Sequence, residues 1–198
     1  MRILGGTFKG RDLPTLEGDG CRPAMAKVRE ALFNMLAARG VELDGARVLD
    51  VFAGTGTLGF ESLSRGAAFV RFVEANKTLA RRIAENARRL GLEPRRFNAD
   101  TADALALLRK PPHAAYDLVF VDPPYGRDLL DPALALLEAR GWLAPLAMVA
   151  VEVEKTLTPT PPASWTQETD RLYGQTRILL WTRNETTPPP SIPEPSTP

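Results

Sequence analysis

The chain has 198 residues, 44% of them hydrophobic and 25% charged, as expected for a soluble globular protein. Its 25 basic and 24 acidic side chains leave a net charge of +1, which excludes a globally basic nucleic-acid binder and an acidic disordered chain. A single cysteine and a single histidine exclude a disulfide framework and a thiolate- or histidine-rich site, so we expect no metal. No apolar run approaches the ~20 residues of a membrane span, and no apolar stretch of a secretion signal follows Met1. We therefore expect a cytoplasmic protein without membrane contact.

The first forty residues differ in pattern from the rest of the chain. Residues 2–13 contain two strand-like pieces around a Gly-Gly pair, which predicts a β-hairpin. A helix follows, with Pro23 in its first turn and Gly40 beyond its end. We predict that residues 1–40 form an N-terminal hairpin and helix extension. Its hairpin carries three basic side chains: Arg2, Lys9 and Arg11.

From residue 46 onward, strand-like and helix-like segments alternate. We expect strands at residues 47–51, 69–74, 95–98, 116–122 and 147–153. We expect one helix that ends near residue 65 and three more at residues 77–90, 102–108 and 129–140. A last pair of strands, 167–173 and 176–182, turns at Gly174. Alternating βα units followed by a hairpin predict an α/β fold with a Rossmann-like, mostly parallel, doubly wound sheet and an antiparallel C-terminal hairpin. This domain would span residues 41–183, and the proline-rich residues 184–198 would form a disordered tail.

A glycine-rich segment, Asp50-Val-Phe-Ala-Gly54-Thr-Gly56-Thr-Leu-Gly59, follows the first predicted strand. Its glycines match G-x-G-x-x-G, in which missing side chains let a ligand approach the backbone. A tight structural turn explains the glycines alone almost as well. Asp50 would repel a dinucleotide pyrophosphate, but it suits a cofactor that carries an ammonium and a sulfonium group. S-adenosylmethionine is such a cofactor.

Two further acidic residues follow later strands. Glu74 ends the second predicted strand, where a carboxylate accepts both hydroxyls of a ribose, and both NAD and S-adenosylmethionine offer them. Asp100, in Asn98-Ala99-Asp100, can accept a hydrogen bond from an adenine amine or cap the next helix. The predicted cofactor site comprises Asp50, Ala53, Gly54, Thr55, Gly56, Glu74, Asp100 and Thr101.

The segment Asp122-Pro123-Pro124-Tyr125 directly follows an apolar predicted strand. The two prolines fix the backbone so that the Asp122 carboxylate and the Pro123 carbonyl point into one cleft. Two acceptors around an exocyclic amine favour a tetrahedral nitrogen and free its lone pair to attack a sulfonium methyl group. Tyr125 supplies an aromatic face on which an extruded base stacks. We predict that these four residues are catalytic, because a rigid turn explains the prolines but not the acid and the aromatic residue.

Taken together, these motifs resemble the RsmD family over residues 1–182. The segments that carry the resemblance are Arg2-Ile-Leu-Gly-Gly-Thr-Phe-Lys-Gly-Arg11, Arg22-Pro23, Val28-Arg-Glu-Ala-Leu-Phe-Asn34, the glycine motif, Asp122-Pro-Pro-Tyr125 and Tyr173-Gly174. The family commonly has a threonine after Arg-Pro and then a polar or acidic residue, whereas this chain has Ala24 and Met25. Any hydroxyl contact from that position is therefore lost.

The resemblance implies a Rossmann-like S-adenosylmethionine-dependent methyltransferase with S-adenosyl-L-methionine as its cofactor. The implied reaction methylates the exocyclic N(2) amine of one guanine in 16S rRNA, within the small ribosomal subunit or its assembly intermediate. The N-terminal extension would bind RNA, and we expect the protein to be a monomer. The predicted RNA-binding residues are Arg2, Lys9, Arg11 and Arg22.

Three other functions fit part of the sequence. The Asp-Pro-Pro-Tyr motif does not distinguish between bases, so an amino-methyltransferase acting on DNA adenine or on another RNA is the nearest alternative. An NAD-dependent dehydrogenase would explain the glycines and Glu74, but not Asp50 or the Asp-Pro-Pro-Tyr motif. A catalytically silent RNA-binding subunit would have no use for an intact cofactor site.

Overall fold

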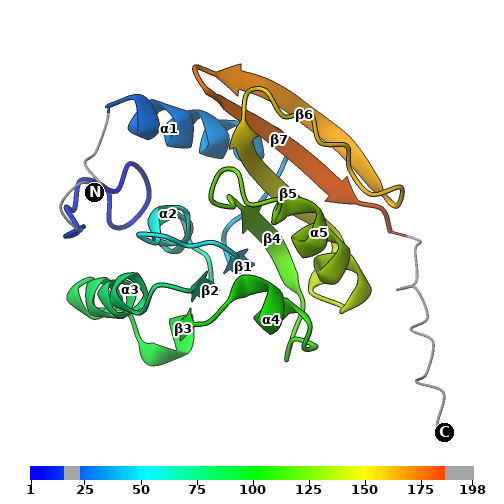
Figure 1. Ribbon diagram of the computed structural model, residues 1–198. Helices are drawn as coiled ribbons and strands as arrows, with labels where there is room; N and C mark the ends of the chain where they lie inside the picture. Colours follow the sequence, from blue (N-terminus) through cyan, green and yellow to red (C-terminus); the bar gives the residue numbers. More distant parts are fainter. Residues whose placement is uncertain (16–22, 186–198) are drawn as a thin grey trace, which may run out of the picture.

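Seven strands form one sheet in the order β3-β2-β1-β4-β5-β7-β6 in the computed structural model, which describes residues 1–15 and 23–185 (Figure 1). Strands β1 to β5 run parallel, and β7 runs antiparallel to both β5 and β6. This arrangement confirms the predicted fold class. The strands are β1 (Arg47–Asp50), β2 (Phe69–Glu74), β3 (Phe97–Thr101), β4 (Tyr116–Val121), β5 (Leu143–Glu154), β6 (Trp165–Tyr173) and β7 (Thr176–Arg183).

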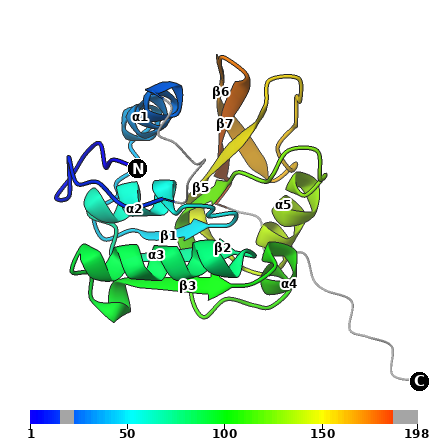
Figure 2. The same ribbon diagram turned by 60° about the vertical axis from the view of Figure 1, so that its left-hand side comes forward.

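Helices cover both faces of the sheet, as Figures 1 and 2 show. One core lies between the sheet and the helices α1, α2 and α3, and a second core lies between the sheet and α4 and α5. Burial on both faces explains why β4 is apolar at every position except Asp117. The helices are α1 (Pro23–Ala38), α2 (Thr57–Ser64), α3 (Lys77–Arg89), α4 (Ala104–Leu108) and α5 (Leu130–Ala139).

The strand order reverses between β1 and β4. From β1 the chain runs outward to β2 and β3, and then returns to place β4 on the other side of β1. In open α/β sheets, ligands bind beyond the carboxyl ends of the strands at such a reversal. The carboxyl ends of β1 and β4 carry the glycine segment and the Asp-Pro-Pro-Tyr motif, so both motifs lie at the expected binding edge.

Three predicted strands begin at other residues than expected. The sixth starts at Trp165 rather than residue 167. The third starts at Phe97 rather than residue 95, because Pro94–Arg96 form a short 3-10 helix. The fifth starts at Leu143, four residues earlier than expected, and its pairing with β4 shifts register between Tyr116 and Leu118. The later start of β3 places Asp100 within the strand instead of beyond it.

The N-terminal hairpin is reduced to one isolated antiparallel bridge, between Arg2 and Asp12. The two ends of the segment still pair, since the Ile3 amide donates to the Arg11 carbonyl at 3.0 Å and the Leu13 amide to the Met1 carbonyl at 2.7 Å. The loop between them also bonds to α2, where the Thr7 amide donates to the Ser64 carbonyl at 2.7 Å. Gly6 has φ of +73°, and a Cβ atom there would lie 1.8 Å from the Ser64 carbonyl oxygen. The Gly-Gly pair therefore permits a close approach to α2. The two predicted pieces do meet in antiparallel orientation, but they form one bridge instead of two regular strands.

Parts of the predictions lie outside the described residues. These are Cys21, Arg22 and the tail from residue 186 onward. Within the described part of the chain, no helix is long and apolar enough to cross a membrane.

Candidate functional site

The three glycines of the glycine segment serve three different purposes. Gly54 has φ of +53°, and nothing lies within 4 Å of the position where its Cβ would be, so a ligand can approach the backbone there. Gly56 also has a positive φ, of +77°, and opens α2. At Gly59 a Cβ atom would lie 2.1 Å from the ring of Phe72, so this glycine allows α2 to pack on β2. Only the first position combines the loop conformation with open space for a ligand.

Glu74, at the end of β2, is anchored through both carboxylate oxygens. Its Oε2 accepts a hydrogen bond from the Gly54 amide at 2.8 Å, and its Oε1 accepts one from the Asn76 amide at 2.7 Å. A carboxylate has about four acceptor positions, so these two bonds leave capacity for the hydroxyls of a ribose. The same bonds tie the glycine segment to β2, which fixes the acid and the loop relative to each other.

Asp50 is buried beneath the glycine segment, with 3% of its surface exposed. Its carboxylate accepts a hydrogen bond from the Gly59 amide at 3.2 Å. Burial raises the pKa of Asp50 to about 7; the Gly59 bond acts in the opposite direction, and the charge of Glu74 raises it further. A cationic ligand next to this buried acid would stabilise its ionised form.

The remaining predicted cofactor residues extend this edge of the sheet. Ala53 is buried and its amide donates to the Val73 carbonyl at 3.0 Å, whereas the half-buried Thr55 shares a hydroxyl hydrogen bond with Thr57 at 2.8 Å. Thr101 is exposed at the end of β3. These positions agree with a binding edge, but their contact with a cofactor stays a prediction.

Asp100 has a protein partner of its own. Its Oδ2 forms an ion pair with the Arg71 guanidinium at 2.7 Å, and the Asn98 amide nitrogen lies 3.2 Å from both of its oxygens. The alternative that Asp100 caps the following helix is wrong, because Asp103 occupies that position and accepts from the Ala106 amide. Contact between Asp100 and an adenine amine stays a prediction, and it would compete with Arg71.

The Asp-Pro-Pro-Tyr motif follows β4 without a gap. Asp122 is half-buried, Pro123 is buried, and Pro124 and Tyr125 are exposed, with 53% of Tyr125 accessible. Burial raises the pKa of Asp122 well above its usual range, and the charges of Glu152 and Asp50 add to the effect. An exposed ring beside a half-buried acid is the arrangement that a stacked base with an exocyclic amine requires.

Sequence reasoning missed Glu152, which approaches Asp122 closely enough to raise its pKa. Glu152 lies near the end of β5, is half-buried, and has a pKa raised by burial. The signal in the sequence was a charged residue within the apolar run Val149-Ala-Val-Glu-Val153. It was overlooked because only acids at the predicted ends of strands were considered.

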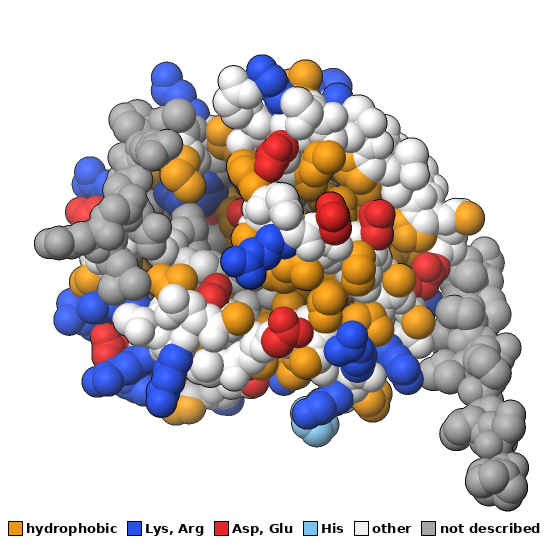
Figure 3. Space-filling view, in the orientation of Figure 1, with side chains coloured by type: hydrophobic (Ala, Val, Ile, Leu, Met, Phe, Trp, Pro, Cys, Tyr) orange, Lys and Arg blue, Asp and Glu red, His pale blue; other side chains and the backbone are white. Residues whose placement is uncertain are grey.

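A pocket of about 520 Å³ borders the motif on the side of α5. Its walls include Pro123, Tyr125 and Leu130 on one side, with Val153 and Leu157 on the other. Hydrophobic side chains, with acidic and basic ones among them, gather in the middle of the face seen in Figure 3. Asp122 is not part of the pocket wall, so the pocket adjoins the polar site and does not contain it.

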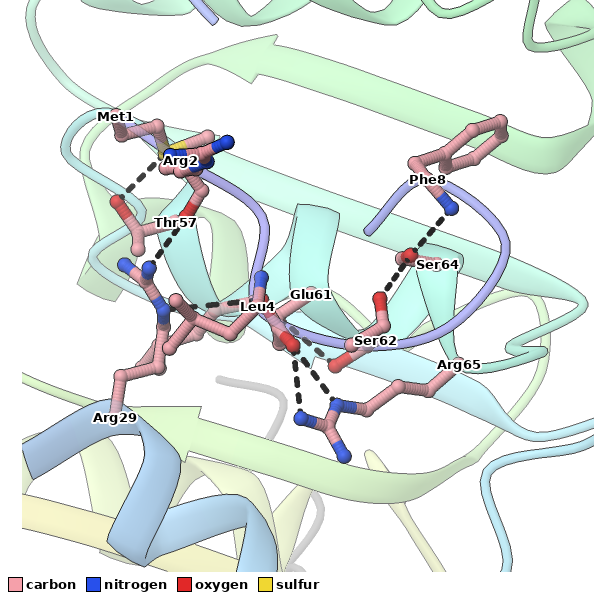
Figure 4. A network of polar contacts seen from close by, with 12 residues as sticks. Met1, Arg2, Leu4, Phe8, Arg29, Thr57, Glu61, Ser62, Ser64 and Arg65 are labelled. Atoms are coloured by element: carbon pink, nitrogen blue, oxygen red, sulfur yellow. Dashed lines mark hydrogen bonds and ion pairs between the residues drawn. The ribbon is translucent and has the colours of Figure 1, made fainter. Parts of the chain in front are cut away.

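The N-terminal segment, residues 1–15, is fixed against α2 by a buried acid (Figure 4). Glu61, with 1% of its surface exposed, accepts from the Leu4 amide at 2.9 Å and forms ion pairs with Arg65 at 2.9 Å and Arg29 at 3.8 Å. Arg29, from α1, also donates to the Arg2 carbonyl at 2.6 Å. One carboxylate thus joins α1, α2 and the N-terminal segment.

The predicted RNA-binding side chains of this segment are exposed. Arg2 keeps one hydrogen bond, from its Nε to the Gly10 carbonyl at 3.3 Å, and the Arg11 guanidinium lies 5.7 Å from the centre of the Phe8 ring. Lys9 is also exposed. The segment adjoins the start of α2, since the Thr57 hydroxyl lies 3.1 Å from the Met1 sulfur. The segment that carries these basic side chains therefore runs along α2, from Met1 at its start to Phe8 at its end.

Within the described residues, no group of three or more histidine, cysteine, aspartate or glutamate side chains is arranged to hold a metal ion. His113 is exposed in the connection between α4 and β4. The site is therefore described by its carboxylates, its glycine segment and one aromatic ring.

Comparison with known proteins gives consistent matches along nearly the whole chain. A family model described as Conserved hypothetical protein 95 matches residues 1–182. Ribosomal RNA small subunit methyltransferase D of Escherichia coli (strain K12) is 39% identical over 184 residues, which cover 92% of this chain and 90% of that protein. The protein of the same name from Haemophilus influenzae is 37% identical, with coverage of 91% and 93%. A solved structure described as the putative methyltransferase yhhF from Escherichia coli superimposes with a TM-score of 0.82 at 35% identity, over 93% of this chain and 98% of that one.

Proposed function

The chain belongs to the Conserved hypothetical protein 95 family, which is the RsmD family, and from this premise we propose that it methylates the N(2) amine of a guanine in 16S rRNA. The methyl donor is S-adenosyl-L-methionine. The observation that carries the proposal is the placement of Asp122 and the glycine segment at the carboxyl ends of neighbouring strands, β4 and β1. The family membership confirms the resemblance inferred from the sequence.

The residues at the end of β1 fit this cofactor. The open backbone at Gly54 lets a ligand approach, Glu74 keeps acceptor capacity for a ribose, and buried Asp50 favours a cation. A pyrophosphate in the same place would meet the charge of Asp50, so these features support S-adenosylmethionine over NAD. The bound cofactor supplies a methyl group already activated by its sulfonium. The protein has mainly to hold the acceptor nitrogen in line with that group.

We assign acceptor binding to the four residues of the Asp-Pro-Pro-Tyr motif. The Asp122 carboxylate and the Pro123 carbonyl each accept a hydrogen from the amine, which leaves its lone pair free for attack. Tyr125, with Pro124 fixing the turn before it, stacks on the extruded base. As the nitrogen–methyl bond forms, the amine loses one proton, and Asp122 is suited to accept it because burial raises the pKa of its carboxylate.

We assign RNA binding to the N-terminal extension, residues 1–40. Arg2, Lys9 and Arg11 are exposed on the segment that packs along α2, the helix that follows the glycine segment, where they could contact RNA phosphates. Arg22, outside the described residues, belongs to the same proposed surface. The substrate would be the small ribosomal subunit or its assembly intermediate, and the protein would act as a monomer in the cytoplasm.

Transfer of a tritiated methyl group tests this function directly. We expect wild-type protein to label 16S rRNA in small subunits that lack the modification, with the label recovered as N(2)-methylguanine. Label recovered in DNA adenine instead would favour the alternative methyltransferase. Calorimetric binding of NAD without binding of S-adenosylmethionine would favour a dehydrogenase and contradict the proposal.

A further inference from the structure

Glu152 lies beside Asp122 at the binding edge of the sheet. In the parallel register of β4 and β5, Val121 pairs with Val151. The two acids come one residue later, Asp122 directly after the end of β4 and Glu152 within β5. Neighbouring strands are about 4.8 Å apart. Phe120 and Ala150, two residues before the acids, belong to the same core between the sheet and α1–α3. Because side chains alternate between faces, the two carboxylates lie on that same face.

The surroundings of this pair differ from those of the other acids at the edge. Asp50 and Glu74 accept hydrogen bonds from backbone amides, whereas no hydrogen bond or ion pair from the described residues reaches the carboxylate of Asp122 or Glu152. On its other side, Glu152 is opposite the apolar Ile178 of β7. Carboxylates that receive no hydrogen bond from the protein keep their acceptor positions free for the donors of a ligand. The raised pKa of each acid reflects its burial.

The chemistry of the substrate matches two adjacent acceptors. On the Watson–Crick edge of guanine, the N(2) amine stands next to N1–H, so the base offers two neighbouring groups of donors. Adenine and other purines without an N1 hydrogen offer an acceptor at N1, which a carboxylate would repel. A site that accepts a hydrogen bond rejects analogues that lack the donor.

We infer that Glu152 accepts the hydrogen bond of guanine N1–H while Asp122 holds the N(2) amine, so that Glu152 selects guanine as the methyl acceptor. This inference rests on the proposed function and names the residue that sets the base preference of the same site. It also separates guanine from adenine, which the Asp-Pro-Pro-Tyr motif does not do.

The decisive experiment changes the enzyme and the base together. Small subunits are reconstituted with either guanine or 2,6-diaminopurine at the position that wild-type protein methylates. The diaminopurine keeps the N(2) amine but has no hydrogen on N1. We expect wild-type protein to prefer guanine by about 10- to 100-fold in kcat/KM, as for loss of one hydrogen bond to a charged group. Glu152→Gln should narrow this ratio about 10-fold, because its amide can donate to an unprotonated N1.

Two further variants make the result specific. Glu152→Asp keeps a carboxylate and should keep the guanine preference at a lower rate. Glu42→Gln, the same chemical change at an exposed residue before β1, should leave rate and ratio unchanged. If Glu152→Gln lowers kcat/KM equally for both bases, Glu152 has a merely structural role and the inference is overturned. Equal use of both bases by wild-type protein would overturn it without any variant, whereas absence of guanine methylation would instead contradict the proposed function.

Discussion

The two halves of the binding edge are built in opposite ways. At the ends of β1 and β2, Glu74 and Asp50 accept hydrogen bonds from Gly54, Asn76 and Gly59, so the protein positions these acids before any ligand arrives. At the ends of β4 and β5, Asp122 and Glu152 receive no such bond from the described residues. If the proposed roles hold, the cofactor half is organised before the ligand arrives, whereas the acceptor half leaves its carboxylate oxygens free for donors of the base.

Removal of Asp122 should have the largest effect, and it should fall on turnover. We expect Asp122→Ala to lower kcat by about 10²–10³, as when a positioned polar group is removed from a transition state. Affinity for S-adenosylmethionine should change little, because the cofactor half keeps its own hydrogen bonds. Single-turnover transfer of tritiated methyl to small subunits measures the rate, and calorimetry measures the affinity.

A matched control for this variant is His113→Ala, at an exposed residue between α4 and β4, which should be nearly silent. Chelating agents should also leave the rate unchanged. Near-normal turnover by Asp122→Ala would contradict the mechanism. Equal losses of turnover and cofactor affinity would contradict the separation of the two halves.

Glu74 tests the cofactor half. We expect Glu74→Ala to weaken binding of S-adenosylmethionine by about 1.5–3 kcal/mol, because it removes charge-assisted hydrogen bonds to a ribose and releases the Gly54 amide. Glu74→Gln keeps one acceptor oxygen and should lose less affinity for S-adenosylmethionine than Glu74→Ala. Calorimetry on both variants, with Glu42→Ala as an exposed control, measures the difference. Unchanged affinity in Glu74→Ala would remove this residue from the site.

The pH dependence of stability should report on Asp50. Burial raises its pKa to about 7, so between about pH 4 and pH 7 the folded protein holds a proton that the unfolded chain has released. The free energy of unfolding of the ligand-free protein should therefore fall as pH rises through this window, by at most about 1.4 kcal/mol per pH unit from this group. Urea unfolding at several pH values should show a smaller slope in Asp50→Asn. An identical slope in the variant would show that Asp50 is ionised throughout.

We expect the smallest effect from changes to the proposed RNA surface. They should weaken binding of the substrate and leave both halves of the binding edge unchanged. Reversal of Lys9 and Arg11 to glutamate should weaken binding to small subunits and flatten its log–log salt dependence by about 0.7–0.9 per lost phosphate contact. Cofactor affinity should stay the same. The same double reversal at Arg109 and Lys110, exposed at the end of α4, serves as the matched control. If both double variants bind alike, the RNA surface lies elsewhere.

Local patterns sufficed for most of the fold and for much of the site. Glycine and proline mark the ends of helices, and apolar runs mark the strands, so β2 has the bounds expected from the sequence. The positions of Asp50, Glu74 and Asp122 at strand ends were also predicted correctly, while their roles stay predictions. These features depend on residues that are close together in the chain, which is why the sequence reveals them.

The features that sequence reasoning missed depend on contacts between distant residues. The register of β4 and β5 places Glu152 beside Asp122, and the sequence alone does not reveal this register. The Gly-Gly pair has the sequence pattern of a hairpin turn. Its close contact with Ser64, which is distant in the sequence, appears only in the structure. Asp100 was expected beyond its strand because the 3-10 helix that delays β3 has no strong local signal.

The buried acid Glu61 has a consequence for the order in which the protein forms. Leu4 and Phe8 must wait for their partners during synthesis, since Leu4 bonds to a side chain 57 residues later and Phe8 to one 56 residues later. Closing such loops costs entropy before the contacts repay it. The N-terminal segment should therefore become ordered after α2 has formed, and the basic side chains proposed to hold RNA should come into place late. The proposed RNA-binding surface would then take its final form only after the helix that follows the glycine segment.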